Sequence, residues 1–267
     1  MFQKLIDRGF QVEIHSHAEA ILSVDFPDAV TELEAVVGAL SIPIEEIIGS
    51  GGGETQGTQR LRNGLADVGW KKLNFVVEKR INGVAREAIS HEIDHVKKFP
   101  AGVIACEIEW NNKDPFYDRD LENFKRLHAD GAISVGIIIT RGTTMQDQMR
   151  EMVHRFAVEK GLNSHEAVEA FGMARTARQK KEVERRLKAG VSYEEAWATH
   201  FVSDKYGAAT THWAKLEDRV RRGVGNPCPL VLIGLPASIV TFNENINLAE
   251  IADAEETMVE KGIVSSG

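Results

Sequence analysis

Apolar residues along the chain fall into short continuous runs that alternate with longer stretches of helical periodicity. Residues 70–78 and 102–109 have the pattern of strands, and residues 132–140, AISVGIIIT, are β-branched and apolar, as in a buried strand. PLVLIGL, residues 229–235, predicts a final buried strand. Strands that alternate with helices in this way predict an α/β or α+β fold around a mixed central sheet flanked by helices.

Helical periodicity occupies most of the remaining chain. Residues 17–40, 122–129 and 208–222 each predict helical structure, and residues 145–200 are almost wholly helical in pattern. Ser164 and Ser192 stand where helix N-caps are expected within that block. We therefore expect a single domain over residues 1–267, with residues 145–203 as a helical insertion.

Two segments depart from this alternation. IGSGGGETQG, residues 48–57, predicts a surface loop, and it lacks the Gly-Lys-Ser/Thr ending of a nucleotide-binding P-loop. Residues 244–261 are a candidate for an acidic helix. Neither segment predicts a nucleotide site.

Composition sets the class of protein more broadly. The 267 residues are 43% hydrophobic and 27% charged, which is enough for a substantial core. The sequence contains no run of about 18 apolar residues, so we expect no membrane span. The N-terminus also lacks the apolar region of a secretory signal. Because Cys106 and Cys228 are the only cysteines, we expect a reducing, cytoplasmic setting.

Charge is unevenly distributed, although the net charge of −8 at first argues against a polyanionic partner. Residues 1–60 hold ten acids against three bases, and residues 241–267 hold six acids and one base. Residues 175–222 hold twelve bases and seven acids. A local positive field matters more for the approach of nucleic acid than the sum over the chain does. A solvated helix face would also explain these bases.

Two carboxylates leave the predicted strand 102–109 on one face. Glu107 and Glu109 alternate with Cys106 and Ile108, so the acids share the face opposite the cysteine. Carboxylates about 7 Å apart on one face repel each other, and a divalent cation such as Mg²⁺ relieves that repulsion. The alternative is a strand end with two solvated acids, and in both cases we expect the Glu107 side chain on the solvent face.

A second acidic cluster lies upstream, in SHEIDHVKKF. As a strand, this segment places Glu92 and Asp94 on one face, with His91, Ile93 and His95 on the other. A turn at residues 100–102 would bring Asp94 beside Glu107 in a hairpin. Acids on adjacent strands are typical of metal-dependent phosphodiesterases, in which the metal activates the attacking water.

The same segment supports a rival interpretation. His91 and His95, with Glu92, match the H-E-x-x-H signature of zinc metalloproteases. That signature requires a helix, which residues 84–96 could form. Asp94 inside the motif and Pro100 soon after it count against the zinc site.

These residues together resemble a known family. HAEAIL (17–22), EIDHVK (92–97), the Glu107-x-Glu109 strand and GIIITRG (136–142) resemble restriction endonucleases of the BglII kind, within the PD-(D/E)xK nuclease superfamily. The resemblance runs from about residue 10 to 142 and resumes near 203–240. It implies a five-stranded mixed sheet and a homodimer that cuts double-stranded DNA with Mg²⁺, for which Mn²⁺ can substitute. A partner DNA methyltransferase is also implied.

The resemblance assigns roles to the acidic residues. Asp94 and Glu107 are implied as metal ligands, with the backbone carbonyl of Ile108 as a third. Glu109 occupies the last motif position, where many members have Lys, and it resembles the Glu-x-Glu variant of BamHI. The implied reaction leaves a 5′-phosphate and a 3′-hydroxyl. A repair or recombination nuclease of the same superfamily is the alternative function.

Other charged residues near the motif have two interpretations each. Lys113 is a candidate catalytic cation, and it would equally pair with Asp114 at the surface. Asp118, Arg119 and Asp120 are expected to cap and charge the start of the following helix.

The expected DNA contacts lie later in the chain. They combine cations, hydroxyls, an aromatic ring and amide or imidazole groups, which suit phosphates and base edges. Thr210 or Thr211 would alternatively N-cap the helix that continues from Trp213, and the bases of the helical insertion would form a recognition or clamp subdomain. The candidate contacts are Lys205, Tyr206, Thr210, Thr211, His212, Arg219, Arg222 and Asn226.

Overall fold

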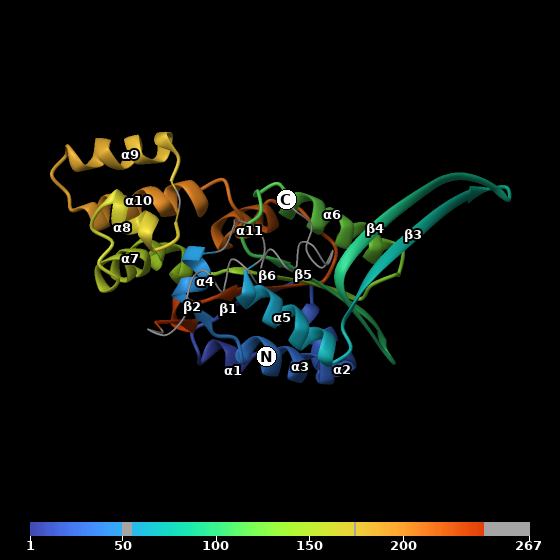
Figure 1. The fold of residues 1–267 in the computed structure, drawn as a ribbon. Coiled ribbons are helices and arrows are strands. Elements are labelled where there is room, and N and C mark those ends of the chain that lie inside the picture. The colour runs from blue at the N-terminus through green and yellow to red at the C-terminus, as the bar shows by residue number, and fades with distance from the viewer. Residues whose placement is uncertain (50–54, 174, 243–267) are drawn as a thin grey trace.

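The computed structural model describes residues 1–49, 55–173 and 175–242, and the side chains of all of these except 85–88. Its centre is a six-stranded mixed sheet in the order β1-β7-β6-β5-β4-β3 (Figure 1). β5, β6 and β7 are parallel to one another, whereas β1, β4 and β3 add antiparallel neighbours at the two sides. The strands are β1 (Gln11–His15), β3 (Lys71–Ile81), β4 (Val84–Phe99), β5 (Gly102–Glu109), β6 (Val135–Arg141) and β7 (Leu230–Leu235).

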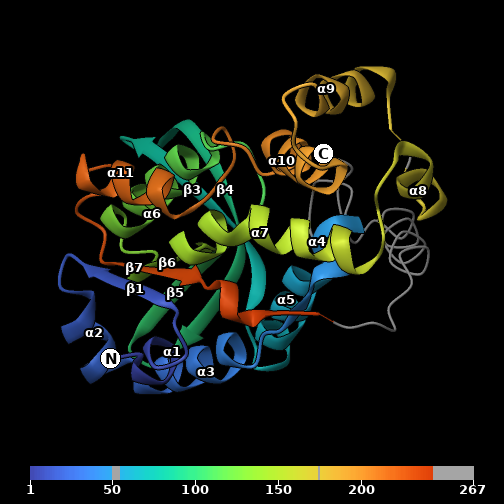
Figure 2. The same cartoon turned by 90° about the vertical axis from the view of Figure 1, so that its left-hand side faces the viewer.

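Helices cover both faces of this sheet (Figure 2). One face carries α6 and α11, and the other carries the N-terminal helices with α5 and α7. The first layer comprises α6 (Phe116–Ala129) and α11 (Trp213–Arg221). The second comprises α1 (Gln3–Ile6), α2 (Ala18–Asp25), α3 (Pro27–Gly38), α4 (Ile44–Gly49), α5 (Gln56–Asp67) and α7 (Thr143–Glu159). A small parallel pair, β2 (Ile42–Pro43) and β8 (Val240–Thr241), lies beside them, and the 3₁₀ helix η1 (Ala237–Ile239) precedes β8.

The parallel strands are buried because both faces are covered. All seven residues of β6 and all six of β7 are buried, as their continuous apolar runs predict. Along β5, Cys106 belongs to the cluster under α7, whereas Ala105 belongs to the cluster under α6. The prediction that Cys106 faces the core opposite the acids is thus confirmed.

The predicted helical block consists of α7 with α8 (His165–Ala170), α9 (Ala177–Leu187) and α10 (Tyr193–Lys205). Ser164 and Ser192 cap α8 and α10 as expected, since each hydroxyl accepts a backbone N–H three residues on, at 3.1 and 3.2 Å. Trp197 and Phe201 of α10 belong to the same apolar cluster as Ile137 of the central sheet. The block therefore shares its core with the sheet.

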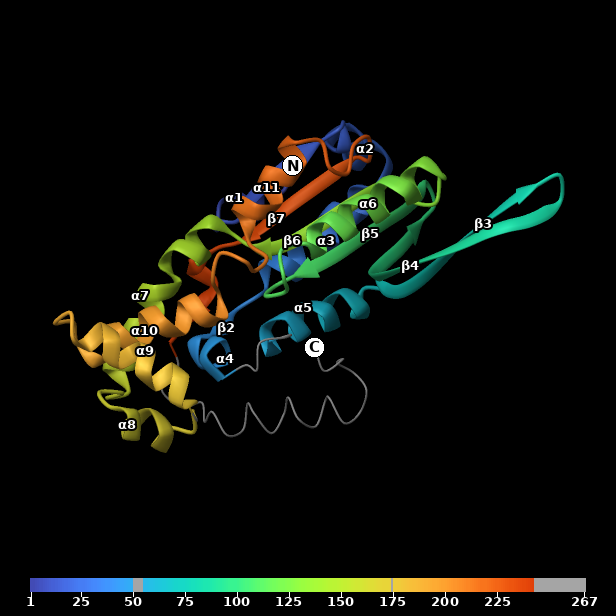
Figure 3. The same ribbon diagram turned by 90° about the horizontal axis from the view of Figure 1, so that it is seen from above.

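β3 and β4 form a long hairpin that projects beyond the rest of the molecule (Figure 3). Near its base, β4 carries an extra residue: Lys71 pairs with Val96 and Leu73 with Ile93, so two residues of β4 lie opposite Lys72. As a result, Ile93 and Val96 contact the same apolar cluster although they are three residues apart. The strict alternation expected for this segment is therefore wrong at the bulge.

Several elements differ from the sequence prediction. The sheet has six strands instead of five, because β1 pairs with β7 at the edge. Within 48–57, α4 ends at Gly49 and α5 begins at Gln56, so the predicted loop is shorter; residues 50–54 lie outside the described residues. The candidate helix 244–261 also lies outside them. No helix in the described ranges is long and apolar enough to cross a membrane.

Candidate active site

The zinc interpretation fails because His91 and His95 lie on the strand β4. Four residues along a strand span about 13 Å, whereas zinc ligands lie about 2 Å from a common ion. The ring of His91 instead hydrogen-bonds Asn123 through Nδ1, at 2.8 Å. His95 is buried and its pKa falls to about 4, chiefly through desolvation, so the ring is neutral.

Glu107 and Glu109 lie under α6 near the end of β5. Only 4% of Glu107 and 3% of Glu109 is exposed, so the expected solvent-facing position is wrong. The end of the strand is held from behind by Thr140, whose hydroxyl donates to the carbonyl of Glu109 at 2.7 Å. In turn, Tyr117 of α6 lies 2.6 Å from that hydroxyl. The two acids are therefore carried on a rigid strand and enclosed by a helix.

Asp120 is a third buried acid in this site. It lies on α6 with no exposed surface, and its Oδ2 atom has no hydrogen-bond partner among the described residues. Its Oδ1 atom is 2.8 Å from the guanidinium of Arg119, which also lies 3.7 Å from Glu109. Asp118 lies in the first turn of α6, as expected, but the expectation that Asp120 caps the helix is wrong, because α6 begins four residues earlier, at Phe116.

Asp94 lies at the bulge, next to the point where β4 separates from β5. The ladder between these strands pairs His95 with Cys106, and one further step places Asp94 opposite Glu107. The charge of Asp94 contributes to the raised pKa of Glu107 and of Asp120, so the three acids share one electrostatic environment. On its other side, Asp94 is 3.7 Å from Lys72.

Burial and mutual repulsion dominate the electrostatics of the site. The pKa of Glu107 is raised well above its usual value by desolvation and then by the charges of Asp120, Asp94 and Glu109. Desolvation and Asp120 likewise raise the pKa of Glu109, against a 2.7 Å hydrogen bond from the Asn112 side chain. The site thus holds more buried negative charge than its nearby bases neutralise.

The donor atoms suit a hard cation. Carboxylate oxygens are the ligands that Mg²⁺ prefers, and the unpartnered Oδ2 of Asp120 is an available one. As they stand, however, no three His, Cys, Asp or Glu side chains of the described ranges surround a common point as metal ligands do. The metal-binding roles of Asp94, Glu107 and Ile108 stay predictions.

Arg141, at the end of β6, fixes the loop that follows Glu109. Its fully buried guanidinium donates to the carbonyl of Trp110 at 2.8 Å and to Thr210 Oγ1 and the carbonyl of Thr211, each at 2.7 Å. Burial lowers its pKa to about 10. Thr211 then pairs with Asn112, the residue that hydrogen-bonds Glu109. Nothing in the sequence indicated this network, because Arg141 marked only the end of a strand.

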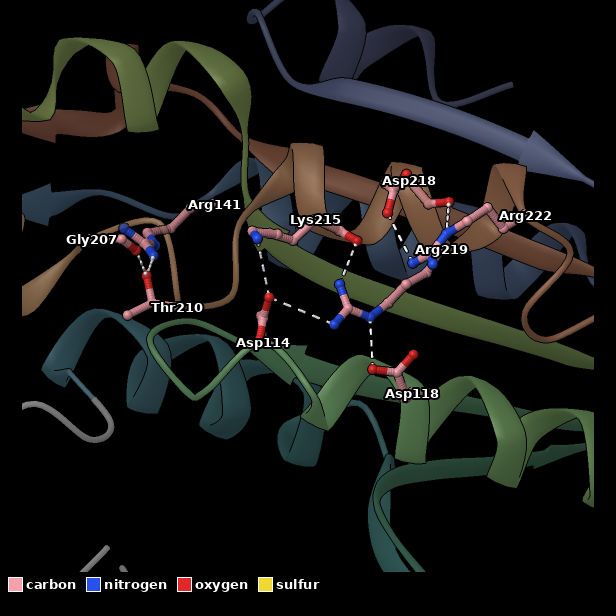
Figure 4. A network of polar contacts seen from close by, with 9 residues as sticks. All are labelled: Asp114, Asp118, Arg141, Gly207, Thr210, Lys215, Asp218, Arg219 and Arg222. Atoms are coloured by element: carbon pink, nitrogen blue, oxygen red, sulfur yellow. Dashed lines mark hydrogen bonds and ion pairs between the residues drawn. The ribbon is translucent and has the colours of Figure 1, made fainter.

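Lys113 lies on the same loop but is exposed, and it forms a backbone bridge with Thr210. The alternative pairing of Lys113 with Asp114 is wrong. Asp114 is bound instead by Lys215 at 3.2 Å and by Arg219 at 3.6 Å (Figure 4).

The structure divides the expected DNA contacts into buried and accessible residues. Tyr206 is buried and donates to the carbonyl of Ile47 at 2.8 Å, and Thr211 is fully buried. Arg219 is buried between Asp114 and Asp118, at 3.6 and 2.9 Å (Figure 4). These three side chains hold the fold together, and their assignment to DNA stays a prediction.

The other candidates reach the surface to different degrees. Arg222 and Asn226 are exposed, whereas Lys205, Thr210 and His212 are half-buried. His212 is the N-cap residue of α11, so neither Thr210 nor Thr211 caps that helix. Trp213, which follows His212, is buried in the core.

A six-stranded mixed sheet flanked by helices, with buried acids on β5 and α6, is consistent with the restriction-endonuclease-like fold. The family model for restriction endonuclease BglII/BglIII matches residues 10–235. Because this match spans most of the sequence, the chain belongs to that family of restriction endonucleases and is a deoxyribonuclease. Among curated proteins, none matches the chain.

Proposed function

We propose that the protein is a Mg²⁺-dependent, site-specific endonuclease of a restriction–modification system. It hydrolyses double-stranded DNA and leaves 5′-phosphate and 3′-hydroxyl ends. The observation that carries this proposal is the set of acids at the base of the β4–β5 hairpin, where Glu107, Glu109 and Asp120 are buried beside Arg119 and outnumber it. Buried carboxylates without compensation are costly unless a cation neutralises them.

Asp94, Glu107 and the carbonyl of Ile108 would hold the metal ion, and Mn²⁺ would fit the same oxygen donors. When bound, the ion would polarise the phosphate and lower the pKa of a water molecule. Glu109, held by Asn112 at 2.7 Å, is positioned to orient that water or to accept its proton.

We assign the cationic role to Arg119 instead of Lys113. The Arg119 side chain is 54% exposed, yet it lies within 3.7 Å of Glu109 and 2.8 Å of Asp120. Its ring contact with Phe116, at 4.4 Å, keeps the guanidinium over the site. A guanidinium in this position can bind a phosphate oxygen next to the acids.

DNA would reach the site across the surface that carries His212, Arg222 and Asn226, with Lys205 and Thr210 behind it. These residues follow one another from the end of α10 through α11 to the loop before β7.

We also propose that the enzyme acts as a homodimer, since two active sites are needed to cut both strands in one event. Sedimentation at equilibrium tests this, and a monomer that still makes double-strand cuts in one event would contradict it. A DNA methyltransferase would protect the host's own sites.

Incubation of the protein with a large DNA and Mg²⁺ tests the function. Discrete fragments are expected, and EDTA should abolish them. A smear would indicate a general nuclease, and intact but shifted DNA would indicate a binding protein. End-labelling of the fragments checks for the 5′-phosphate. The His91→Gln variant serves as a control, because a zinc protease would depend on His91 and this nuclease does not.

A further inference from the structure

A groove of about 830 Å³ lies between α9 and α10, at the end of the molecule opposite the β3–β4 arm (Figure 1). Arg178, Lys181, Arg185 and Lys188 line it. These positions follow the spacing i, i+3, i+7 and i+10, so the four bases share one face of α9. The groove thus has a basic wall along the full length of one helix.

Three acids also line the groove, and one of them, the exposed Glu184, lies 3.8 Å from the ring of His165. Glu182 is bound by Arg185 at 2.6 Å, and Asp204 accepts a hydrogen bond from Gln179 at 3.0 Å. In contrast, Arg178, Lys181 and Lys188 have no ion pair within the described parts of the chain. The groove lining thus holds four bases against three acids, and the bases without an ion pair lie on one face of α9.

A buried polar atom of His200 adds a second, independent observation. His200 lines the groove, is only 8% exposed, and its Nε2 atom has no hydrogen-bond partner among the described residues. An unsatisfied buried polar atom costs free energy, and a hydrogen bond to a ligand in the groove would relieve that cost.

We propose that this groove binds phosphates of the DNA backbone, as a grip separate from the cleavage site; this inference rests on the proposed endonuclease function. From Arg178 to Lys188 the helix rises about 15 Å, the axial length of about four phosphates on one strand. α9 also lies on the same side of the sheet as α6, which covers the acids (Figures 1 and 2). The proposal requires one duplex to extend from α6 to α9.

The test compares two double variants that each remove one Arg and one Lys. Arg178→Gln/Lys181→Gln alters the groove, and Lys4→Gln/Arg8→Gln alters exposed bases on α1 and just after it, across the sheet. Binding to a long mixed-sequence duplex is measured over a range of salt concentrations, in a Glu107→Gln background that prevents cleavage. The groove variant should lose about two units from the slope of log K against log salt, since each phosphate contact contributes about 0.9. The α1-side variant should keep the parental slope.

Cleavage by the same double variants, with Glu107 intact, separates the outcomes. At saturating DNA the groove variant should cut at the wild-type rate, because its bases do not contact the reacting phosphate. If the wild type cuts DNA but both double variants keep the parental slope, the groove assignment is wrong and the endonuclease function stands. If the wild type neither binds nor cuts DNA, both proposals fail. Calorimetry with inorganic phosphate tests whether the groove binds a small anion instead of DNA. If the wild type binds phosphate at millimolar concentration, the groove variant does not, and the salt dependence of DNA binding is the same for both, the groove is a small-anion site and the proposal is wrong.

Discussion

At the level of single residues, the acids of the site work against the stability of the fold. Glu107, Glu109 and Asp120 are buried close enough to raise one another's pKa. Under the proposed function this site trades stability for activity, because acids placed to bind a cation repel one another without it. Replacing one of these acids should therefore raise stability and lower activity.

Glu107→Gln should therefore stabilise the metal-free protein while it abolishes cleavage. Removal of one buried, repelled charge is expected to add about 1 kcal/mol, or about 2–4 °C in Tm for a chain of this size. Cleavage should fall by about 10³-fold or more, because several kcal/mol of transition-state stabilisation depends on the metal. Glu122→Gln, on the outer face of α6, is the matched control and should change neither. A lower Tm for Glu107→Gln would mean that the glutamate is structural.

Arg219→Gln should act on stability instead of DNA binding. It removes the contacts of α11 with Asp114 and Asp118, at an expected cost of about 1–3 kcal/mol. Thermal melting measures this loss, and the salt dependence of DNA binding should not change. Arg222→Gln is the control for melting, because its exposed pair with Asp218 contributes little. A reduced salt slope with unchanged Tm would return Arg219 to the DNA surface.

The sequence predicted Glu107 and Glu109 because alternation along one strand is local. It did not predict Asp120 or Arg119, whose places depend on how α6 lies across the sheet. One signal was nevertheless present: Asp120 falls within the buried stripe of Tyr117, Leu121 and Phe124. An acid in the apolar stripe of a helix indicates a buried site.

At the level of elements, continuous apolar runs predicted β5, β6 and β7 well. The sequence of β4 could be interpreted as a strand or as a helix. Its exposed arm and its bulge interrupt the alternation of apolar and polar residues that identifies a strand. β1, with the mixed sequence QVEIH, was not predicted, since its strand form depends on pairing with β7. Edge strands of this kind are specified by their neighbours more than by their own pattern.

The two loops after β5 and α10 act as one element, and Thr211→Val tests this. The change removes the hydroxyl that accepts the backbone N–H of Asn112 at 3.1 Å, and so frees the residue that orients Glu109. We expect cleavage to fall about tenfold and stability by about 1 kcal/mol, with DNA affinity retained. Thr211→Ser keeps the hydroxyl and should restore the rate. Equal cleavage rates for Thr211→Val and the wild type would show that this loop does not position Glu109.

At the level of the whole molecule, the three buried acids should make a contribution to stability that falls as pH rises, in the direction opposite to that of paired surface acids. The folded-state pKa values of Glu107, Glu109 and Asp120 lie above their unfolded values, so the folded state binds more protons between the two. The contribution of these groups to the free energy of unfolding therefore falls as pH rises from about 4 through the folded pKa values. Melting curves in EDTA from pH 5 to 8 measure it. Glu107→Gln should show a shallower dependence, and an identical slope would contradict the coupling.

The bulge on β4 also limits how the length of the β3–β4 arm can vary among members of the family. Its extra residue sets the arm and the base of the hairpin out of phase, so that Ile93 and Val96 bury on one side. Deletion of one residue at positions 94–95 would turn the whole arm over relative to the sheet. Shortening at the distal turn, by one residue from each strand, would keep every pairing nearer the base. Among relatives, we expect arms of many lengths on hairpins whose bulge is never lost.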